Sequence, residues 1–307
     1  MITLFSCPKA FKNQFDTIQR NAIESWLSLG KNVDIVLVGQ EEGMEEVCKE
    51  YKIKHIRNIE RNEYGTPLVK SIVTQAENNS ENELMCYVNA DIVILKDFIE
   101  AINVLEKKKH NDKYLLTGRR WDLLIEDRIK YNESSWEADL KDRLRKNGRL
   151  DAPTGLDYFV YKKGMWASMP RFALGRNFWD QWFIHEARIN KIVVVDGTPS
   201  ITIIHQHHDY SHLPNSGYWL SKGPETKNNF KLSGGVFKLY NIFDATETLE
   251  NNLLVKNNVS VKCKAILIRI KLFVVYTITY TLYPYSLPLI QTYKVIRYVI
   301  RKIAKLF

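Results

Sequence analysis

The sequence predicts an α/β fold, with a mostly parallel central sheet flanked by helices and a basic helical tail at the C-terminus. First, short apolar strands alternate with amphipathic helices over the first half of the chain, as in a doubly wound sheet. Second, the composition is that of an ordinary folded protein, because 45% of the 307 residues are hydrophobic and 26% are charged. Third, the acids stop at Glu250, whereas the cations continue to the end of the chain.

The first half of the chain contains the clearest elements. We expect strands over Ile2–Phe5, Val33–Val38, Lys54–Ile56, Leu84–Val88 and Tyr114–Thr117. We expect helices over Phe15–Leu29, Met44–Tyr51, Pro67–Glu77 and Asp97–Lys107. Gly30 lies where a helix-ending glycine belongs, and Thr66 is suited to cap the helix that Pro67 begins.

The second half of the chain is less regular. We expect strands over Tyr158–Tyr161, Ile192–Val195 and Ile201–Ile204, and helices over Ser134–Lys146 and Asn177–Ile189. A turn-rich stretch follows from Pro214 to Gly235, and the sequence contains no internal repeat.

The charge divides the chain into a globular domain over residues 1–250 and a tail over residues 251–307. The first part carries 34 cations and 35 anions, whereas the second carries ten cations and no acid. A nucleic-acid-binding domain needs a basic face of its own. We therefore expect no nucleic-acid partner, and we expect the basic tail to contact a different polyanion.

The cysteines and the N-terminus indicate a reducing compartment. The four cysteines are scattered and contain no Cys-x-x-Cys pair, which favours neither a disulfide framework nor a zinc site. The first residues have only a short apolar run and no preceding cations, so they are typical of a strand rather than a secretion signal. We expect a cytoplasmic protein.

Several predicted loops lie at the carboxyl ends of strands, where open α/β sheets bind ligands. Asn89 and Asp91 follow the strand Leu84–Val88, and a carboxylate there can hold a hard divalent cation. The alternative is that Asp91 only caps a turn. Pro8-Lys9 and Gly65-Thr66 belong to the same edge, and a lysine with a helix start suits phosphate.

Further charged groups follow in the chain. Arg119 and Arg120 come after the strand Tyr114–Thr117, where they either bind a diphosphate or form a solvated turn. Asp180 lies between Trp179 and Trp182 in the first turn of a helix, where the helix dipole favours an acid. The tryptophans suit either a sugar-stacking surface or the core.

A histidine cluster is the densest local signal. Four of the seven histidines, His205, His207, His208 and His212, lie within eight residues. Metal ligation is one interpretation. The other is a hydrogen-bonded loop that supports the site.

Taken together, these segments resemble the GT-A nucleotide-diphospho-sugar glycosyltransferases, in particular a bacterial family-2-like branch. The resemblance covers residues 1–212 and rests on the order and spacing of its segments. They are Pro8–Phe11, Ile18–Trp26, Gly65–Leu68, Tyr87–Ile92, Thr117–Asp122, Asp157–Tyr161, Trp179–Trp182 and His205–His212.

The resemblance implies a Rossmann-like GT-A sheet in which residues 1–125 bind a nucleotide-sugar donor and residues 126–250 bind a glycan or lipid-linked acceptor. The implied donor-binding residues are Pro8, Lys9, Gly65, Thr66, Asn89, Asp91, Arg119 and Arg120. The implied acceptor-binding residues are Asp157, Tyr158, Trp179 and Trp182. Asp180 is similar in position to the catalytic base of inverting members.

The resemblance also implies a divalent cation, Mn²⁺ or Mg²⁺, on the donor diphosphate. Its ligands would be Asp91, His205 and His208. The chain departs from the family's Asp-x-Asp motif, because Asn89 stands at the first acid and Asp91 is the only carboxylate left.

Two other functions remain open at this point. A sugar nucleotidyltransferase uses a similar sheet, but such enzymes begin with a glycine-rich loop, and Ser6-Cys7-Pro8-Lys9 is not glycine-rich. A non-catalytic nucleotide- or sugar-binding protein would need no base.

The tail carries two membrane signals. Leu272–Tyr293 is uncharged but contains Pro284, Pro288 and several tyrosines, which prefer the interface to the bilayer core. Val295–Phe307 places apolar residues on one helix face and cations on the other, the pattern of a helix lying on an anionic membrane. We expect peripheral attachment to the inner face of the cell membrane. The alternative is a helix packed on the globular domain or on a second subunit.

Overall fold

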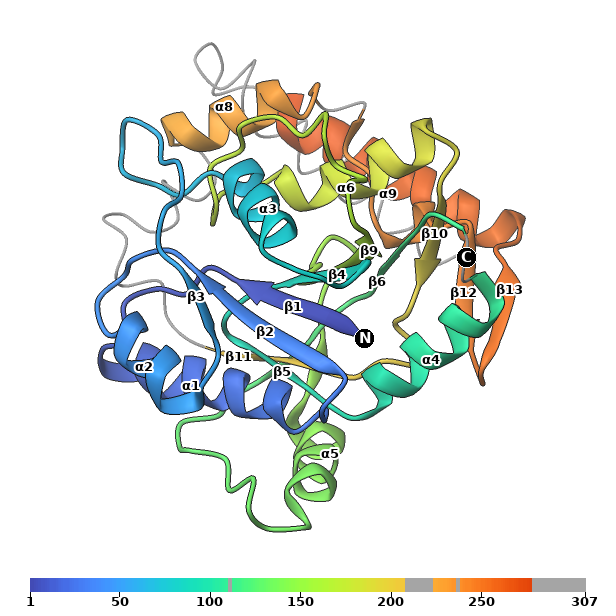
Figure 1. Cartoon of the computed structure of the whole chain (residues 1–307). Coiled ribbons are helices and arrows are strands. Elements are labelled where there is room, and N and C mark those ends of the chain that lie inside the picture. The colour runs from blue at the N-terminus through green and yellow to red at the C-terminus, as the bar shows by residue number, and fades with distance from the viewer. Residues whose placement is uncertain (110–111, 208–222, 236–237, 278–307) are drawn as a thin grey trace.

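The computed structural model describes residues 1–109, 112–207, 223–235 and 238–277, which form an α/β fold with two sheets (Figure 1). The nine strands of the central sheet lie in the order β13-β12-β10-β6-β9-β4-β1-β2-β3. Their bounds are β1 (Ile2–Ser6), β2 (Val33–Val38), β3 (Lys54–Ile56), β4 (Leu84–Val88), β6 (Tyr114–Thr117), β9 (Tyr158–Lys162), β10 (Val193–Asp196), β12 (Glu247–Glu250) and β13 (Leu253–Lys256).

The central sheet is mostly parallel, as the sequence predicts. β1 pairs in parallel with β2 and β4, and β10 pairs in parallel with β6 and β12. The exceptions are β9, which runs antiparallel between β4 and β6, and the β12–β13 hairpin. Because β9 is reversed, its amino end lies at the carboxyl ends of its two neighbours.

Helices cover both faces of the central sheet (Figure 1). One layer contains α1 (Asn13–Leu27), α2 (Met44–Tyr51) and α4 (Asp97–Lys109), and the other contains α3 (Val69–Asn78) and α6 (Trp179–Ile189). Successive strand residues face opposite layers. In β4, Cys86 packs toward α1 and α4, while Met85 and Tyr87 pack toward α3 and α6.

A second sheet adjoins the first, and the sequence did not predict it. Its strands lie in the order β5-β11-β7-β8, with bounds β5 (Ile92–Ile94), β7 (Trp121–Leu123), β8 (Arg149–Leu150) and β11 (Ile203–Gln206). The helix α5 (Trp136–Asn147) packs against this sheet through Trp136, Leu140 and Leu144. The second sheet brings β11 next to the residues that follow β4 and β6.

The helix α3 begins two residues later than the sequence predicts. Thr66 is not its cap, because Leu68 is the residue before the helix and is extended. The Pro67 carbonyl accepts a hydrogen bond from the Leu174 N–H at 2.9 Å, and the Leu68 N–H donates to the Glu60 carbonyl at 3.0 Å. These contacts to distant segments hold the backbone extended, so the prediction that Pro67 begins the helix is wrong.

The C-terminal part continues with α8 (Pro224–Leu232), the 3₁₀ turn η2 (Ile242–Asp244) and α9 (Val259–Thr277). The boundary expected after residue 250 falls in the turn of the β12–β13 hairpin, so Leu253–Lys256 is an edge strand of the sheet. Within residues 1–109, 112–207, 223–235 and 238–277, no helix is long and apolar enough to cross a membrane. The predicted Val295–Phe307 helix and most of Leu272–Tyr293 lie outside the described residues.

Candidate functional site

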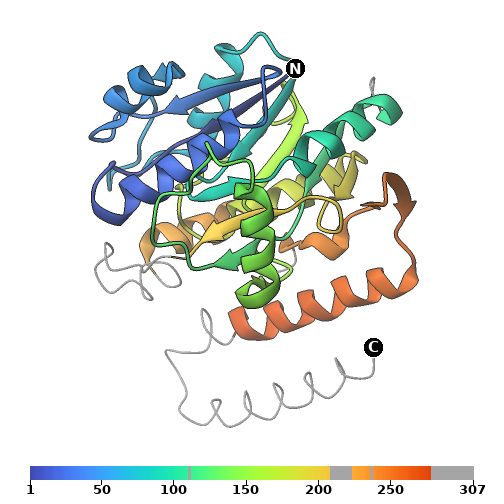
Figure 2. The same ribbon diagram turned by 90° about the horizontal axis from the view of Figure 1, so that it is seen from below.

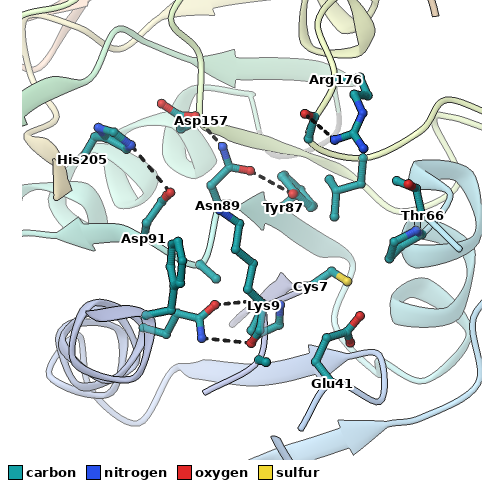
Figure 3. A pocket seen from close by; sticks show the side chains of 18 of the residues that line it. Cys7, Lys9, Glu41, Thr66, Tyr87, Asn89, Asp91, Asp157, Arg176 and His205 are labelled. Carbon is teal, nitrogen blue, oxygen red and sulfur yellow. Dashed lines mark hydrogen bonds and ion pairs between the residues drawn. The ribbon is translucent and has the colours of Figure 1, made fainter. Parts of the chain in front are cut away.

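A cavity of about 850 Å³ opens at the carboxyl ends of the parallel strands. The loops after β1 and β4 contribute Lys9, Asn89 and Asp91 (Figure 3). Asp157 joins them because it precedes the reversed strand β9, and Arg120 follows β6. The cavity is therefore a direct consequence of the strand directions.

Two hydrogen bonds from Gln19 on α1 hold the loop that carries Lys9. The Lys9 N–H donates to Gln19 Oε1 at 2.6 Å, and Gln19 Nε2 donates to the Lys9 carbonyl at 3.0 Å. The Lys9 ammonium lies 4.3 Å from the centre of the Phe15 ring. Burial lowers the Lys9 pKa, and Asp91 opposes this shift. Lys9 therefore presents a solvent-accessible cation to the cavity, close enough to Asp91 for the two charges to interact.

Asn89 is part of a hydrogen-bonded chain. Its Oδ1 accepts from the Tyr87 hydroxyl at 2.9 Å, and its Nδ2 donates to Asp157 Oδ1. Arg120 Nη1 donates to the other Asp157 oxygen at 2.7 Å. Because an amide can donate to Asp157 and a carboxylate cannot, asparagine suits this position better than the acid of an Asp-x-Asp motif.

A buried histidine in the cavity lies between two carboxylates. His205, on β11, lies 3.6 Å from Asp91 through Nε2 and 3.2 Å from Asp122 through Nδ1. Burial lowers the His205 pKa, but Asp91 and Asp122 outweigh this effect and raise it to about 9. The imidazolium and the two carboxylates therefore compensate one another's charge.

The protein side chains in the cavity could bind a divalent cation but do not supply all of the ligands of its coordination shell. Among the described residues, no group of three or more His, Cys, Asp or Glu side chains is placed to hold a metal ion. Asp91 and His205 both line the cavity. A carboxylate and an imidazole fit a Mg²⁺ or Mn²⁺ site in which substrate phosphates and water supply the other ligands. Because His205 is protonated at neutral pH, a cation would have to replace that proton.

Asp180 lies in the first turn of α6 and lines the same cavity. Burial raises its pKa to about 7; the Gln181 N–H opposes this rise and the charge of Asp157 adds to it. The preceding Phe178 has a left-handed backbone (φ 87°), a strained conformation for a side-chain-bearing residue, and it turns the chain into the helix. Trp179 is held by edge contacts with Tyr87, at 5.2 Å between ring centres.

The cavity also contains a cation that the sequence interpretation did not select. Arg176 lines the wall opposite Lys9, and its guanidinium is bound by the buried carboxylate of Glu225 on α8. The two residues are 49 positions apart, so no local pattern could have paired them. The available signal was an arginine between Gly175 and Asn177, just before the aromatic helix.

The structure brings most of the predicted site residues together. Those that line the cavity are Pro8, Lys9, Gly65, Thr66, Asn89, Asp91, Arg120, Asp157, Trp179, Asp180 and His205. His208 lies outside the described residues.

Three predicted site residues do not line the cavity. Arg119 donates through Nε to the Asp151 carbonyl at 2.7 Å. Tyr158 is buried on the α4 side of the sheet, 6.0 Å from the Phe98 ring, because it alternates with Asp157 along β9. Trp182 packs against Trp166 in the core on the α6 side.

Comparisons with known proteins return matches among solved structures alone. No family model and no curated protein matches the sequence. The structure of S. aureus TarS 1–349 with UDP-GlcNAc is 14% identical over 76% of this chain and 70% of that chain, with a TM-score of 0.43. For another structure of TarS 1–349, this chain spans 59% of its length at 13% identity and a TM-score of 0.41. The M. tuberculosis glucosyl-3-phosphoglycerate synthase with Mg²⁺ and UDP is 9% identical over 76% of this chain and 80% of that chain, with a TM-score of 0.44.

Proposed function

We propose that the protein is a glycosyltransferase that moves a sugar from a nucleotide-diphosphate sugar to a hydroxyl group of a glycan or lipid-linked acceptor. The observation that carries this proposal is the composition of one cavity. Asp180, with its pKa near 7, shares that cavity with the cations Lys9, Arg120 and Arg176. Transfer of a sugar from a diphosphate requires a base for the acceptor and cations for the leaving group.

The donor would lie along the loops after β1 and β4. Lys9 enters the cavity from below and Arg176 from the opposite side, as Figure 3 shows, while Arg120 is held by Asp157. Lys9 and Arg176 line the same cavity. Two cations in one cavity suit a diphosphate. Asp91 and His205 would hold a Mn²⁺ or Mg²⁺ ion, which would neutralise further charge on the diphosphate.

Asp180 would act as the general base. A carboxylate with a pKa near 7 is half ionised at neutral pH and is basic enough to accept a proton from a sugar hydroxyl. As Asp180 takes that proton, the acceptor oxygen forms a bond to the anomeric carbon. The bond from that carbon to the diphosphate oxygen breaks, and its electron pair leaves with the nucleotide diphosphate. A single displacement of this kind inverts the anomeric configuration.

The acceptor would contact the side of the cavity formed by Asp157, Trp179 and Asp180. Trp179 and Asp157 line the cavity with Asp180, and they would contact the acceptor sugar. Tyr158 and Trp182 do not line the cavity, so they are not part of the proposed acceptor site.

A panel of UDP-, GDP-, CMP- and dTDP-sugars tests the proposal, with thermal shift to detect binding and nucleotide release to detect turnover. We expect one donor class to stabilise both the wild type and the Asp180→Asn variant, while only the wild type releases nucleotide. If the protein only binds the nucleotide sugar, the donor would stabilise both the wild type and the variant, and neither would release nucleotide. A nucleotidyltransferase would instead release pyrophosphate from a nucleoside triphosphate and a sugar phosphate. Either of these outcomes contradicts the proposal.

A further inference from the structure

The helix α9 carries apolar residues on two opposite sides. Its inner side packs on the body through the buried Ala265, and Arg269 fixes this side by an ion pair with Asp244 at 3.4 Å. The Arg269 guanidinium also lies over the Tyr240 ring, 4.7 Å from its centre. The opposite side includes Val259, Cys263, Ile266, Ile270 and Phe273, which recur at helical spacing and which we call the outer face.

The outer face exposes large apolar side chains. Val259 is 73% exposed, and Ile266 and Ile270 are each 48% exposed. The strand β13, which precedes α9 in the chain, also exposes Leu253 and Val255. Among the described residues, six of the eleven exposed large hydrophobic side chains lie between residues 253 and 273. Such a concentration marks a contact surface rather than scattered surface residues.

Exposed lysines border the outer face on both sides. On the helix surface, Lys262 lies on one side of the apolar stripe, and Lys264 and Lys271 lie on the other. Lys256 is exposed at the end of β13. No Asp or Glu follows Glu250 anywhere in the sequence. The surface that fits this stripe is therefore both apolar and anionic.

We propose that the outer face of α9 lies on an anionic lipid membrane. The apolar stripe would enter the boundary between headgroups and acyl chains, and the flanking lysines would contact anionic headgroups. A second copy of the chain is a poor occupant, because a symmetric dimer through this face would place the same lysines against each other without a compensating acid. Figure 2 shows α9 as a long helix at the edge of the body.

Cys263 allows a direct test in the full-length protein. Cys7, Cys48 and Cys86 are buried, and burial raises the pKa of each thiol, so they react slowly with thiol reagents. Cys263 is partly exposed and lies in the outer face. An environment-sensitive fluorophore on this thiol reports whether the outer face enters a bilayer.

The labelled protein would be mixed with vesicles of phosphatidylserine and phosphatidylcholine, or of phosphatidylcholine alone. We expect flotation and a blue-shifted emission with the anionic vesicles only. The Ile266→Ser/Ile270→Ser variant should lose at least about tenfold in vesicle affinity, because each buried CH₂ group contributes about 0.8 kcal/mol. The Leu27→Ser/Leu124→Ser variant, which changes two exposed side chains elsewhere, should bind as the wild type does.

Three results would overturn the proposal. Flotation without a spectral shift would mean that another segment binds the vesicles. Equal flotation of the Ile266→Ser/Ile270→Ser variant, with an unchanged melting temperature, would mean that the outer face does not contribute. A concentration-dependent dimer that this variant abolishes would identify a second copy as the occupant.

Discussion

Glu225 accepts two hydrogen bonds from Arg176 on the same oxygen, at 2.9 Å from Nε and 2.6 Å from Nη2. Its other oxygen accepts from the Asn62 side chain at 2.6 Å. Asn62 in turn accepts from the N–H groups of Tyr64 and Thr66, which line the cavity with Arg176. One buried carboxylate on α8 therefore connects two walls of the cavity.

We expect Glu225→Gln to weaken binding of the nucleotide diphosphate by about tenfold to a hundredfold, since hydrogen bonds to charged groups contribute about 1.5–3 kcal/mol. The neutral amide cannot hold the guanidinium in place. Isothermal titration with the diphosphate and with the matching nucleoside separates this effect from general unfolding, because the nucleoside lacks the anionic group. Arg176→Lys should give the same loss, and Glu225→Asp should restore part of it. Equal losses for nucleoside and diphosphate would assign Glu225 a structural role only.

The pKa of Asp180 predicts a pH dependence of turnover. A base acts in its ionised form, so kcat should fall about tenfold per pH unit below pH 7 and level off above it. Asp180→Asn should lower kcat by about 10²–10⁴-fold and leave donor binding intact. A pH profile of kcat at saturating donor measures the first effect and the loss in the variant, and a binding titration with the donor checks that affinity is retained. A profile that is flat between pH 5 and 8 would contradict the assignment of the base.

The same shift predicts how Asp180 affects stability. The folded-state pKa of Asp180 is raised, so the folded protein retains a proton that the unfolded chain loses between about pH 4 and pH 7. Ionisation of Asp180 therefore lowers the free energy of unfolding of the wild-type protein as the pH rises through this window. The difference in melting temperature, Asp180→Asn minus wild type, should therefore be larger at pH 8 than at pH 4. A difference of the opposite sign would mean that the Asp180 carboxylate is stabilised in the fold.

Asn89→Asp would restore the Asp-x-Asp pattern, yet we expect it to be harmful. The Asn89 amide donates to Asp157, and a carboxylate there would face Asp157 with a like charge. We expect a loss of about 1–3 kcal/mol in unfolding free energy at pH 8, and a smaller loss at acid pH, where one of the two carboxyl groups is protonated. Denaturant titrations at both pH values measure the loss. A gain in metal-stimulated turnover without loss of stability would show that Asn89 is only a substitute for the missing acid.

Asp91→Ala should abolish metal-dependent turnover of the donor, because it removes the carboxylate of the proposed cation site. Turnover would be measured against Mn²⁺ and Mg²⁺ concentration and after addition of EDTA. Asp112→Ala, which changes an exposed acid, is the matched control. Undiminished turnover in the presence of EDTA would exclude the metal mechanism.

Sequence patterns identified the part of the site that depends on strand ends. Lys9, Asn89, Asp91 and Arg120 each follow a strand that is apolar enough to be recognised, and the carboxyl ends of parallel strands share one edge. The prediction that Trp182 and Tyr158 line the site is wrong. An aromatic residue near a site and an aromatic residue in the core have the same local sequence pattern.

The sequence by itself determined the α/β alternation, the sheet edge at which the cavity opens and the concentration of cations after residue 250, because periodicity and charge are local properties of the chain. Only the tertiary structure decided that β9 is reversed, that Asn89 bonds Asp157 and that Glu225 holds Arg176. Arg176 and Glu225 are 49 positions apart along the chain, and Asn89 and Asp157 are 68 positions apart. Which residues become partners depends on strand order and helix packing. Burial of the whole core sets both of these, and no single segment does.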